Sequence, residues 1–138
     1  MQTKLTWNGK MKFNSTTPSG HQLTLDAAQE VGGEDQGPRP TEVLLSAVGA
    51  CSGIDIVDIL KKMRLHVEDF DMEVSGSRAE EHPRRFTHVH IHYRLTGDLP
   101  VEKVRRAVTL SRDTYCSVSQ SLSAEVTTSF SINGETYE

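Results

Sequence analysis

The chain of 138 residues contains 36% hydrophobic and 25% charged residues, a composition that suits one globular domain over residues 1–138. Its 15 Lys and Arg and 19 Asp and Glu give a formal charge of −4, which argues against a general nucleic-acid binder. No apolar run reaches the roughly 18 residues of a membrane-spanning helix, and residues 1–12 lack the apolar segment of a signal peptide. We therefore expect a soluble cytoplasmic protein without nucleic-acid or membrane partners.

The first 25 residues predict a small antiparallel meander. Asn8-Gly9 lies between two alternating segments, where this dipeptide is the strongest short-range signal of a β-hairpin. The apolar side chains that share one parity are Leu5, Trp7, Met11 and Phe13. We expect a third strand over 21–25 and then a loop over 29–40, because glycines and prolines interrupt that stretch.

Residues 41–64 predict the central helix of the domain. The first half, 43–51, is apolar nearly all round, which indicates a helix buried on most sides. The second half is amphipathic, and its last turn carries basic residues that suit the negative end of the helix dipole. Gly49 lies where the two halves meet and is a candidate for a bend.

The second half of the chain predicts strands on either side of another helix. Strands with a period of two are expected over 70–75 and 88–95, each with one buried and one polar face. Apolar residues at helical spacing predict a second helix from about 101 to 116, and a last strand is expected over 126–132. This order predicts an α+β fold with helices on one face of an antiparallel sheet.

The two cysteines, Cys51 and Cys116, are too few for a disulfide-stapled secreted domain or an all-cysteine zinc site. They leave three possibilities: two buried inert thiols, a redox pair, or a catalytic thiol with a bystander. Buried and inert is the commonest state of free cysteines. Both lie in apolar helices that are expected to face the same sheet, so the fold can bring them together although 65 residues separate them.

A reactive Cys51 would have to be a thiolate at neutral pH, and burial of a thiol works against ionisation. Asp55 lies four residues later on the same helix face, where its negative charge would hinder the thiolate further. The stabilising group must therefore come from elsewhere in the fold or from a second subunit. The candidates are Arg39, Lys10 and Lys12, with Glu42 as an orienting group.

Glu42 precedes Cys51 by nine residues, which corresponds to about 900° of rotation and about 13.5 Å of rise in one straight helix. The two side chains would then face opposite ways. Either the helix is broken near Gly49, or Glu42 serves a different partner. Glu42 is also placed as a plain helix-start residue, since the dipole favours a carboxylate in the first turn.

His88, His90 and His92 share one face of a predicted strand. Neighbouring residues on such a face lie ~7 Å apart, which is too far for three rings to bind one ion without distortion. We interpret them as a solvated sheet face. The chain has no phosphate-binding glycine loop, nucleophile elbow or zinc-protease motif, and we predict no cofactor and no metal.

Two cysteine motifs resemble those of a known family. The first reads Gly37-Pro-Arg-Pro-Thr-Glu-Val-Leu-Leu-Ser-Ala-Val-Gly-Ala-Cys51 and continues Ser-Gly-Ile-Asp-Ile-Val-Asp-Ile-Leu-Lys-Lys, and the second reads Tyr115-Cys116-Ser-Val-Ser. Both resemble the motifs of the OsmC/Ohr superfamily, which comprises osmotically inducible proteins and organic hydroperoxide resistance proteins. The sequences of the two motifs are most similar to those of a less characterised OsmC-like branch. The resemblance covers nearly the whole chain.

The resemblance implies an OsmC-like fold in which antiparallel sheets accompany a long buried central helix and a second helix. It also implies an intertwined homodimer with its active sites at the dimer interface. Such a dimer would cover a central helix that is apolar all round. It would also let the partner chain supply groups that Cys51 lacks.

The chemistry implied by the resemblance is thiol-based peroxide reduction. Cys51 matches the peroxidatic cysteine, which becomes a sulfenic acid, and Cys116 matches the resolving cysteine, which forms a disulfide with it. A dithiol reductant then restores both thiols, and apolar surroundings favour organic hydroperoxides over hydrogen peroxide. With Cys51 and Cys116, the resemblance implies Glu42 as the third catalytic residue.

Two positions depart from the family pattern. The characterised peroxidase branches carry the catalytic Glu ten residues before the first cysteine, whereas Glu42 is nine before, and this chain has no Arg before Arg39. Two other readings therefore stand beside the peroxidase. One is a non-catalytic OsmC-like module that binds a small hydrophobic ligand at the dimer interface, and the other is disulfide exchange with a second protein.

Overall fold

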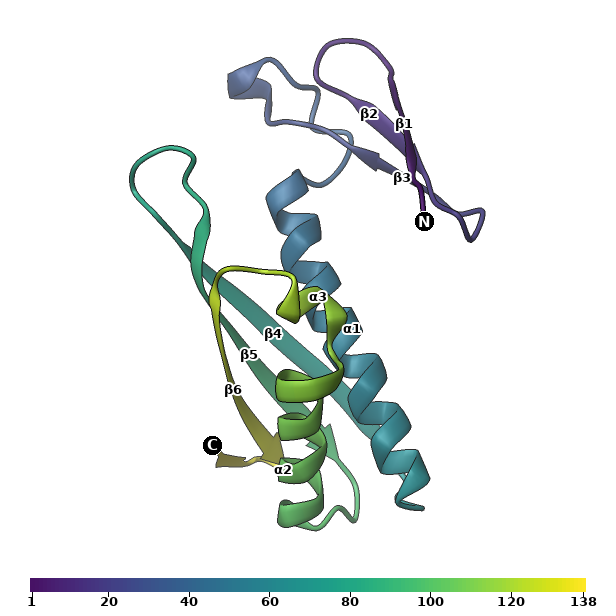
Figure 1. The fold of residues 1–138 in the computed structure, drawn as a ribbon, viewed down its shortest axis with the longest axis vertical. Helices are drawn as coiled ribbons and strands as arrows, with labels where there is room; N and C mark the ends of the chain where they lie inside the picture. Colours follow the sequence, from purple (N-terminus) through teal and green to yellow (C-terminus); the bar gives the residue numbers. More distant parts are fainter. The chain divides into compact units, whose positions relative to one another are not determined.

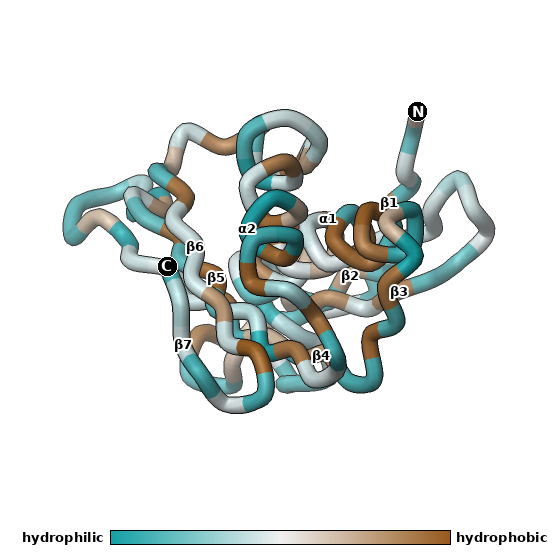
Figure 2. The backbone as a smooth tube through the Cα atoms, turned by 90° about the horizontal axis from the view of Figure 1, so that it is seen from below, coloured by the Kyte–Doolittle hydropathy of each residue, from teal (hydrophilic) through white to brown (hydrophobic).

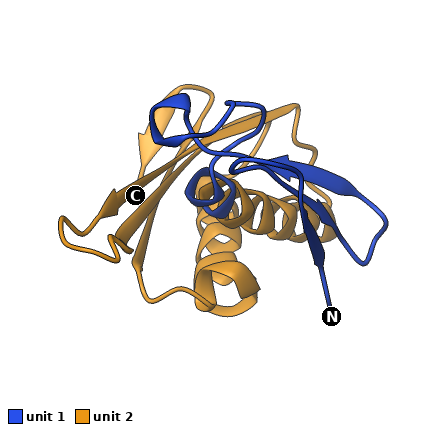
Figure 3. Cartoon of the chain, turned by 90° about the horizontal axis from the view of Figure 1, so that it is seen from above, with its two compact units in different colours: residues 1–44 blue, residues 45–138 orange.

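The computed structural model describes residues 1–138 (Figure 1). The chain forms two compact units, Met1–Leu44 and Leu45–Glu138 (Figure 3). Composition predicts one domain over the whole length and gives no sign of the division into two units. Each unit has its own sheet, and we describe the units in turn.

The first unit is built on the expected antiparallel meander. Its three strands pair in the order β1-β2-β3 and are β1 (Lys4–Trp7), β2 (Phe13–Thr16) and β3 (Gln22–Leu25). The turn predicted at Asn8-Gly9 is present: Gly9 and Lys10 have φ of 85° and 50°, and the Asn8 amide donates to the Lys12 carbonyl at 2.8 Å. Asn8-Gly9 favours this hairpin because glycine enters the left-handed region without steric cost.

The loop predicted over 29–40 is organised around Asp26, which is only 2% exposed. Its carboxylate accepts hydrogen bonds from the backbone amides of Ala27 at 2.7 Å, and of Glu34 and Gln36 at 3.2 Å each. A short 3₁₀ turn, η1 (Gln29–Val31), lies within the loop. The buried carboxylate thus joins three backbone amides of the loop, and backbone hydrogen bonds from Gly33 to Ala28 and from Asp35 to Ala27 hold it as well.

The second unit contains a four-stranded mixed sheet. Its strands pair in the order β4-β5-β6-β7 and are β4 (Asp69–Arg78), β5 (Phe86–Thr96), β6 (Glu125–Ile132) and β7 (Glu135–Tyr137). The expectation of a purely antiparallel sheet is wrong at one pairing, because β5 and β6 run parallel. The chain leaves β5 through the helix α2 (Val101–Leu110) before it returns as β6, and a helical crossover joins parallel neighbours.

The central helix α1 (Pro40–Lys62) begins at the end of the first unit and continues through the second. It is continuous through Gly49, so the alternative of a helix broken there is wrong. A Cβ at Gly49 would lie 2.8 Å from Val74 Cγ2, and a Cβ at Gly53 would lie 2.8 Å from Met72 Cε. The two glycines therefore let α1 pack closely against β4.

One stripe of α1 is buried and another is not. Val48, Ser52, Ile56 and Leu60 are buried at intervals of four residues, whereas Ile54 is 70% and Val57 47% exposed. The expectation of burial on most sides is therefore not met within a single chain. Figure 2 shows the apolar character of this helix.

The helix α1 also corrects the composition argument about membranes. It has 23 residues and a mean hydropathy of 1.9 over its most apolar window, which is long and apolar enough for a membrane span. Its buried stripe packs into the core of the second unit together with α2, β5 and β6. These contacts identify α1 as the core helix of a soluble fold.

The core of the second unit lies between this sheet and the helices. The expected alternation of β5 is confirmed, since Val89, Ile91, Tyr93 and Leu95 are buried. The outer face carries the three histidines, and residues of β6 contact each ring: His88 pairs with Glu125 at 3.0 Å, His90 contacts Thr127 and His92 contacts Ser129, both at 2.7 Å. This agrees with a polar sheet face and not with three rings that converge on one ion.

The helix predicted over 101–116 consists of two segments, and a third helical segment follows it. The helix α2 ends at Leu110, a π-helical turn η2 (Ser111–Tyr115) follows, and a short helix α3 (Ser117–Gln120) begins after Cys116. The Cys116 amide donates to the Ser111 carbonyl at 2.8 Å, which spans five residues instead of the four of an α-helix. Cys116 thus lies at a junction between two helical segments.

Candidate active site

The two cysteines meet in the second unit. Cys51 lies on α1 and is half-buried, whereas Cys116 is 1% exposed. Their sulfur atoms and a carboxylate oxygen of Asp55 all lie within 4.8 Å of one another. The expectation that the fold brings the two thiols together is confirmed.

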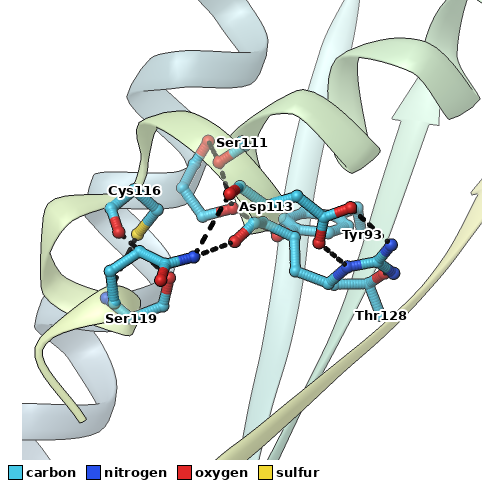
Figure 4. A network of polar contacts seen from close by, with 9 residues as sticks. Tyr93, Ser111, Asp113, Cys116, Ser119 and Thr128 are labelled. Carbon is cyan, nitrogen blue, oxygen red and sulfur yellow. Dashed lines mark hydrogen bonds and ion pairs between the residues drawn. The ribbon is translucent and has the colours of Figure 1, made fainter.

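The position of Cys116 follows from the short segments around it. Its sulfur accepts the backbone N–H of Ser119 at 3.5 Å, and its carbonyl accepts the Ser119 hydroxyl at 3.1 Å (Figure 4). Cys116 is therefore the N-cap of α3. On the other side of Cys116, Arg112 pairs with Asp113 at 2.8 Å and donates to Thr128 of β6 at 3.0 Å, which anchors η2 to the sheet.

Hydrogen-bond donors surround the sulfur of Cys51. Burial raises the pKa of Cys51, but hydrogen bonds from the Val118 backbone amide, the Cys116 thiol and the Ser117 hydroxyl lower it below the ordinary value of a cysteine. The Ser117 Oγ lies 3.9 Å from the Cys51 Sγ. The negative charge of Asp55 raises the pKa of Cys51, as predicted from its position one turn later on the same helix. Donors from the start of α3 thus outweigh both burial and the carboxylate.

The pKa of Cys116 shifts in the opposite direction. Burial raises its pKa, the hydroxyl and backbone amide of Ser119 lower it, and the adjacent Cys51 raises it again. The net pKa of Cys116 is higher than that of an ordinary cysteine. Of the two thiols, Cys51 is therefore the one that ionises more readily.

A buried chain of hydroxyl groups fixes the Asp55 carboxylate. The Ser111 hydroxyl donates to Asp55 Oδ2 at 2.9 Å and lies 3.1 Å from the Ser52 hydroxyl, which is hydrogen-bonded to the Tyr93 hydroxyl. Ser52, Ser111 and Tyr93 are each at most 2% exposed. Burial raises the pKa of Tyr93 to about 12, although the bond to Ser52 lowers it.

This hydroxyl chain is the part of the site that sequence reasoning missed. Ser111 continues the apolar stripe of α2, where Val104, Ala107 and Val108 are buried. A small polar residue at a core position of an amphipathic helix is the signal that could have identified it, because a buried hydroxyl needs a hydrogen-bond partner.

The remaining predicted site residues lie in the first unit and make contacts there. Glu42 accepts the backbone N–H of Arg39 at 2.8 Å, which is the contact of a helix-start residue. The Arg39 guanidinium pairs with Asp35, and the Lys12 ammonium donates to Gln36 at 2.7 Å. Within the second unit, backbone and side-chain hydrogen-bond donors lower the pKa of Cys51, which is the role predicted above for a cation.

A hollow of about 480 Å³ lies beside Asp55. Its apolar wall is formed by Ile59, Met63, Leu110 and Tyr115. Asp58 and Lys62 also line the hollow, and neither cysteine does. Asp55 is therefore the one residue that the hollow shares with the thiol cluster.

The comparisons with known proteins agree with this fold. The OsmC-like protein family matches residues 33–131, and the chain belongs to this family. It is 41% identical over 127 residues to Protein YhfA of Escherichia coli strain K12, which covers 91% of this chain and 92% of YhfA.

Solved structures show the same architecture. A protein of Aquifex aeolicus VF5 superposes with a TM-score of 0.83 at 32% identity and covers 95% of this chain and 94% of its own. An organic hydroperoxide resistance protein OsmC from Legionella pneumophila, at 22% identity, has a TM-score of 0.68 and covers 96% of both chains. The fold is therefore that of the OsmC-like proteins.

Proposed function

We propose that the protein is a thiol peroxidase that reduces organic hydroperoxides. The observation that carries the proposal is the pair of thiols within 4.8 Å of each other, with a lowered pKa at Cys51 and a raised pKa at Cys116. A nucleophilic thiolate and a protonated second thiol beside it are the two groups that peroxide reduction by a cysteine pair needs.

In the first step the Cys51 thiolate attacks the terminal oxygen of the hydroperoxide and breaks the O–O bond. The alkoxide leaves and takes a proton to become the alcohol, while Cys51 becomes a sulfenic acid. Cys116 then attacks the Cys51 sulfur, a disulfide forms and water leaves with the thiol proton of Cys116. A dithiol reductant supplies two electrons and two protons and restores both thiols.

The apolar wall beside Asp55 supports an organic substrate. Ile59, Met63 and Leu110 line the hollow that Asp55 borders, and an alkyl group gains from leaving water whereas hydrogen peroxide has none to bury. The Legionella neighbour, which is named an organic hydroperoxide resistance protein, agrees with this choice. We propose that the protein acts in the response to oxidative stress in the cytoplasm.

The test measures the intact mass of the reduced protein after one equivalent of tert-butyl hydroperoxide, and separately of hydrogen peroxide, without reductant. We expect the loss of two hydrogens, faster with the organic peroxide. Cys116→Ser should instead gain one oxygen that dimedone captures, and Cys51→Ser should not react. An unchanged wild-type mass, or an unchanged rate in Cys51→Ser, would contradict the proposal.

Glu42 belongs to the proposal as a third catalytic residue on the strength of the motif. Glu42→Gln separates its two roles, because glutamine keeps an oxygen that can accept the Arg39 amide but removes the charge. If the charge takes part in catalysis, turnover with hydroperoxide and dithiothreitol falls while the melting temperature stays the same. Full turnover in this variant would leave Glu42 as a helix-start residue only.

We further propose that the protein is a homodimer. The exposed stripe of α1 with Ile54 and Val57 is continuous with an apolar hollow of about 520 Å³ that Phe70 and Met72 of β4 also line. An apolar face on a core helix is typical of an interface between subunits. Ile54→Asp should produce monomers in analytical ultracentrifugation, and Val31→Asp, which changes an exposed residue of the first unit, should not. A wild-type monomer at micromolar concentration would contradict this.

The same hollow is the observation that favours the alternative function, a non-catalytic module that binds a small hydrophobic ligand. It is lined mainly by apolar side chains of α1 and β4. A ligand that raises the melting temperature equally in the wild type and in Cys51→Ala would support this alternative. Unreactive thiols in the mass experiment would support it as well.

A further inference from the structure

We propose that the reduced protein binds a thiophilic divalent cation such as Zn²⁺ through Cys51, Cys116 and Asp55. The two sulfurs and the carboxylate oxygen lie within 4.8 Å of one another and come from two separate segments, α1 and the junction before α3. Two cysteines alone are too few for an all-cysteine zinc site, and the three histidines of β5 are too far apart to bind one ion. The carboxylate one helical turn after Cys51 supplies the third ligand.

The donor set suits zinc. Zinc binds thiolate sulfur at ~2.3 Å and carboxylate oxygen at ~2.0–2.2 Å in a tetrahedron, which puts neighbouring ligand atoms roughly 3.4–3.8 Å apart. Binding therefore requires the three side chains to approach one another by up to about 1 Å from their distances of at most 4.8 Å. Three protein ligands leave the fourth position to water or a solute, as in open zinc sites.

The charges of the cluster favour a cation. With both thiols ionised, the cluster would carry three negative charges in a partly buried place, where like charges repel one another. A bound dication attracts both thiolates and the Asp55 carboxylate and so offsets their mutual repulsion. Because metal binding favours the thiolate form, we expect it to release thiol protons.

The atoms around the three ligands are placed to hold them. Ser111 donates to Asp55 Oδ2 at 2.9 Å and leaves the second carboxylate oxygen to a ligand. The Ser119 amide donates to the Cys116 sulfur at 3.5 Å, and the Val118 amide donates to Cys51. Hydrogen bonds of this kind orient metal ligands and contribute to affinity.

This inference goes beyond peroxide reduction and does not depend on it, because metal binding needs only the two reduced thiols and the carboxylate. If both proposals hold, a bound cation and the disulfide exclude each other, since they use the same two sulfurs. Zinc is then an inhibitor of the peroxidase, and disulfide formation releases the ion.

The test titrates the fully reduced protein with Co²⁺ as a spectroscopic probe and then displaces it with Zn²⁺. We expect one equivalent to produce the charge-transfer band of a thiolate bound to cobalt together with the strong visible bands of a tetrahedral site. Both should vanish in Cys51→Ser, in Cys116→Ser and in protein oxidised with diamide.

Asp55→Asn is the decisive variant, because it changes one ligand and keeps both thiols. We expect its affinity for Zn²⁺, measured against a chromophoric chelator, to fall about 10- to 100-fold. Asp98→Asn, which removes an exposed carboxylate from the loop before α2, should bind like the wild type. Circular dichroism of each variant shows that the fold is retained.

Three outcomes would overturn the inference: equal affinity in Asp55→Asn and wild type, cobalt binding without a thiolate band, or unchanged binding after oxidation by diamide. The two proposals fail separately. If hydroperoxide forms the disulfide but the reduced protein binds no cation, the peroxidase proposal stands and the metal-site proposal fails. If the protein binds the cation but its thiols do not react with hydroperoxide, the metal-site proposal stands and the peroxidase proposal fails.

Discussion

The Asp55 carboxylate lies one helical turn after Cys51 on α1, within 4.8 Å of the sulfur whose ionisation its charge opposes. The carboxylate is held there by the Ser111 hydroxyl at 2.9 Å, the last member of a buried chain that begins at Tyr93. The pKa of Cys51 is thus lowered by donors from Cys116 and the start of α3 in spite of Asp55.

Asp55→Asn should make Cys51 more acidic. Removal of a negative charge favours the thiolate, so the rate of alkylation by iodoacetamide should reach half of its plateau at a lower pH than in the wild type. We expect a shift of up to about one pH unit, equivalent to about tenfold at a pH below the midpoint. The Cys116→Ser background isolates the signal of Cys51, and EDTA keeps metal away.

Asp98→Asn serves as the control in that experiment and should leave the midpoint unchanged. A midpoint that stays in place or rises in Asp55→Asn would show that the carboxylate stabilises the thiolate through some other contact.

Deletion of Thr114 should separate the two thiols while the fold remains. The π-helical turn Ser111–Tyr115 contains one residue more than an α-helical turn, and its removal would rotate the following residue by about 100°. We expect the deletion variant to lose the disulfide between Cys51 and Cys116 under hydroperoxide and to keep its circular dichroism spectrum.

Thr114→Ala keeps the length of the turn and should form the disulfide at the wild-type rate, because Thr114 is exposed. A deletion variant that still forms the disulfide would mean that the π-helical turn does not position Cys116.

Gly49→Ala should be less stable than Gly53→Ala, although both glycines lie in the same helix. The new Cβ at Gly49 would meet the stiff Val74 side chain at 2.8 Å, whereas the one at Gly53 would meet the flexible end of Met72. Overpacking costs about 1–3 kcal/mol, and alanine gains about 1 kcal/mol in a helix. Urea unfolding of both variants measures the difference.

The clash with Val74 can be checked by Val74→Ala in the Gly49→Ala background. The double variant should recover stability relative to the sum of the single effects, since the second substitution makes room for the first. Strict additivity would exclude contact between the two positions.

Tyr93→Phe should change how stability depends on alkaline pH. The pKa of Tyr93 is raised to about 12 by burial, above the value of about 10 in an unfolded chain. Its contribution to the unfolding free energy is therefore fully present below about pH 10 and is lost as pH rises through about 12, by about 2–3 kcal/mol. The variant should show a shallower decline over this range.

At neutral pH the same variant should lose about 1 kcal/mol, because Ser52 keeps Ser111 as a partner and only one hydrogen bond disappears. Urea unfolding at several pH values between 8 and 12 gives both quantities. Parallel pH curves for Tyr93→Phe and wild type would contradict the assignment to Tyr93.

Several features of the fold were predictable from local patterns. The Asn8-Gly9 turn, the alternation along β5 and the order of strands and helices were read from neighbouring residues and agree with the structure. The motif around Cys51 also indicated the family. These features are local because a period of two, a period near 3.6 and the backbone freedom of a turn are set within a few residues.

Other features had no local signal. The parallel pairing of β5 with β6 depends on the path of the chain through α2, and the unbroken course of α1 at Gly49 depends on the nearness of β4. The π-helical turn at Ser111 interrupts a pattern whose apolar spacing predicts one continuous helix. Each of these features depends on contacts between segments that are distant in the sequence, and a local pattern carries no information about such contacts.

The sequence by itself determined that there are two thiols, that a carboxylate follows Cys51 by one helical turn, and that its charge would oppose a thiolate. The tertiary structure decided that the start of α3 supplies the donors that outweigh it and that Cys116 faces Cys51. The physical reason is that a pKa depends on the burial, the charges and the hydrogen bonds within a few ångströms of the group. Residues 65 positions apart reach that distance only when the chain is folded.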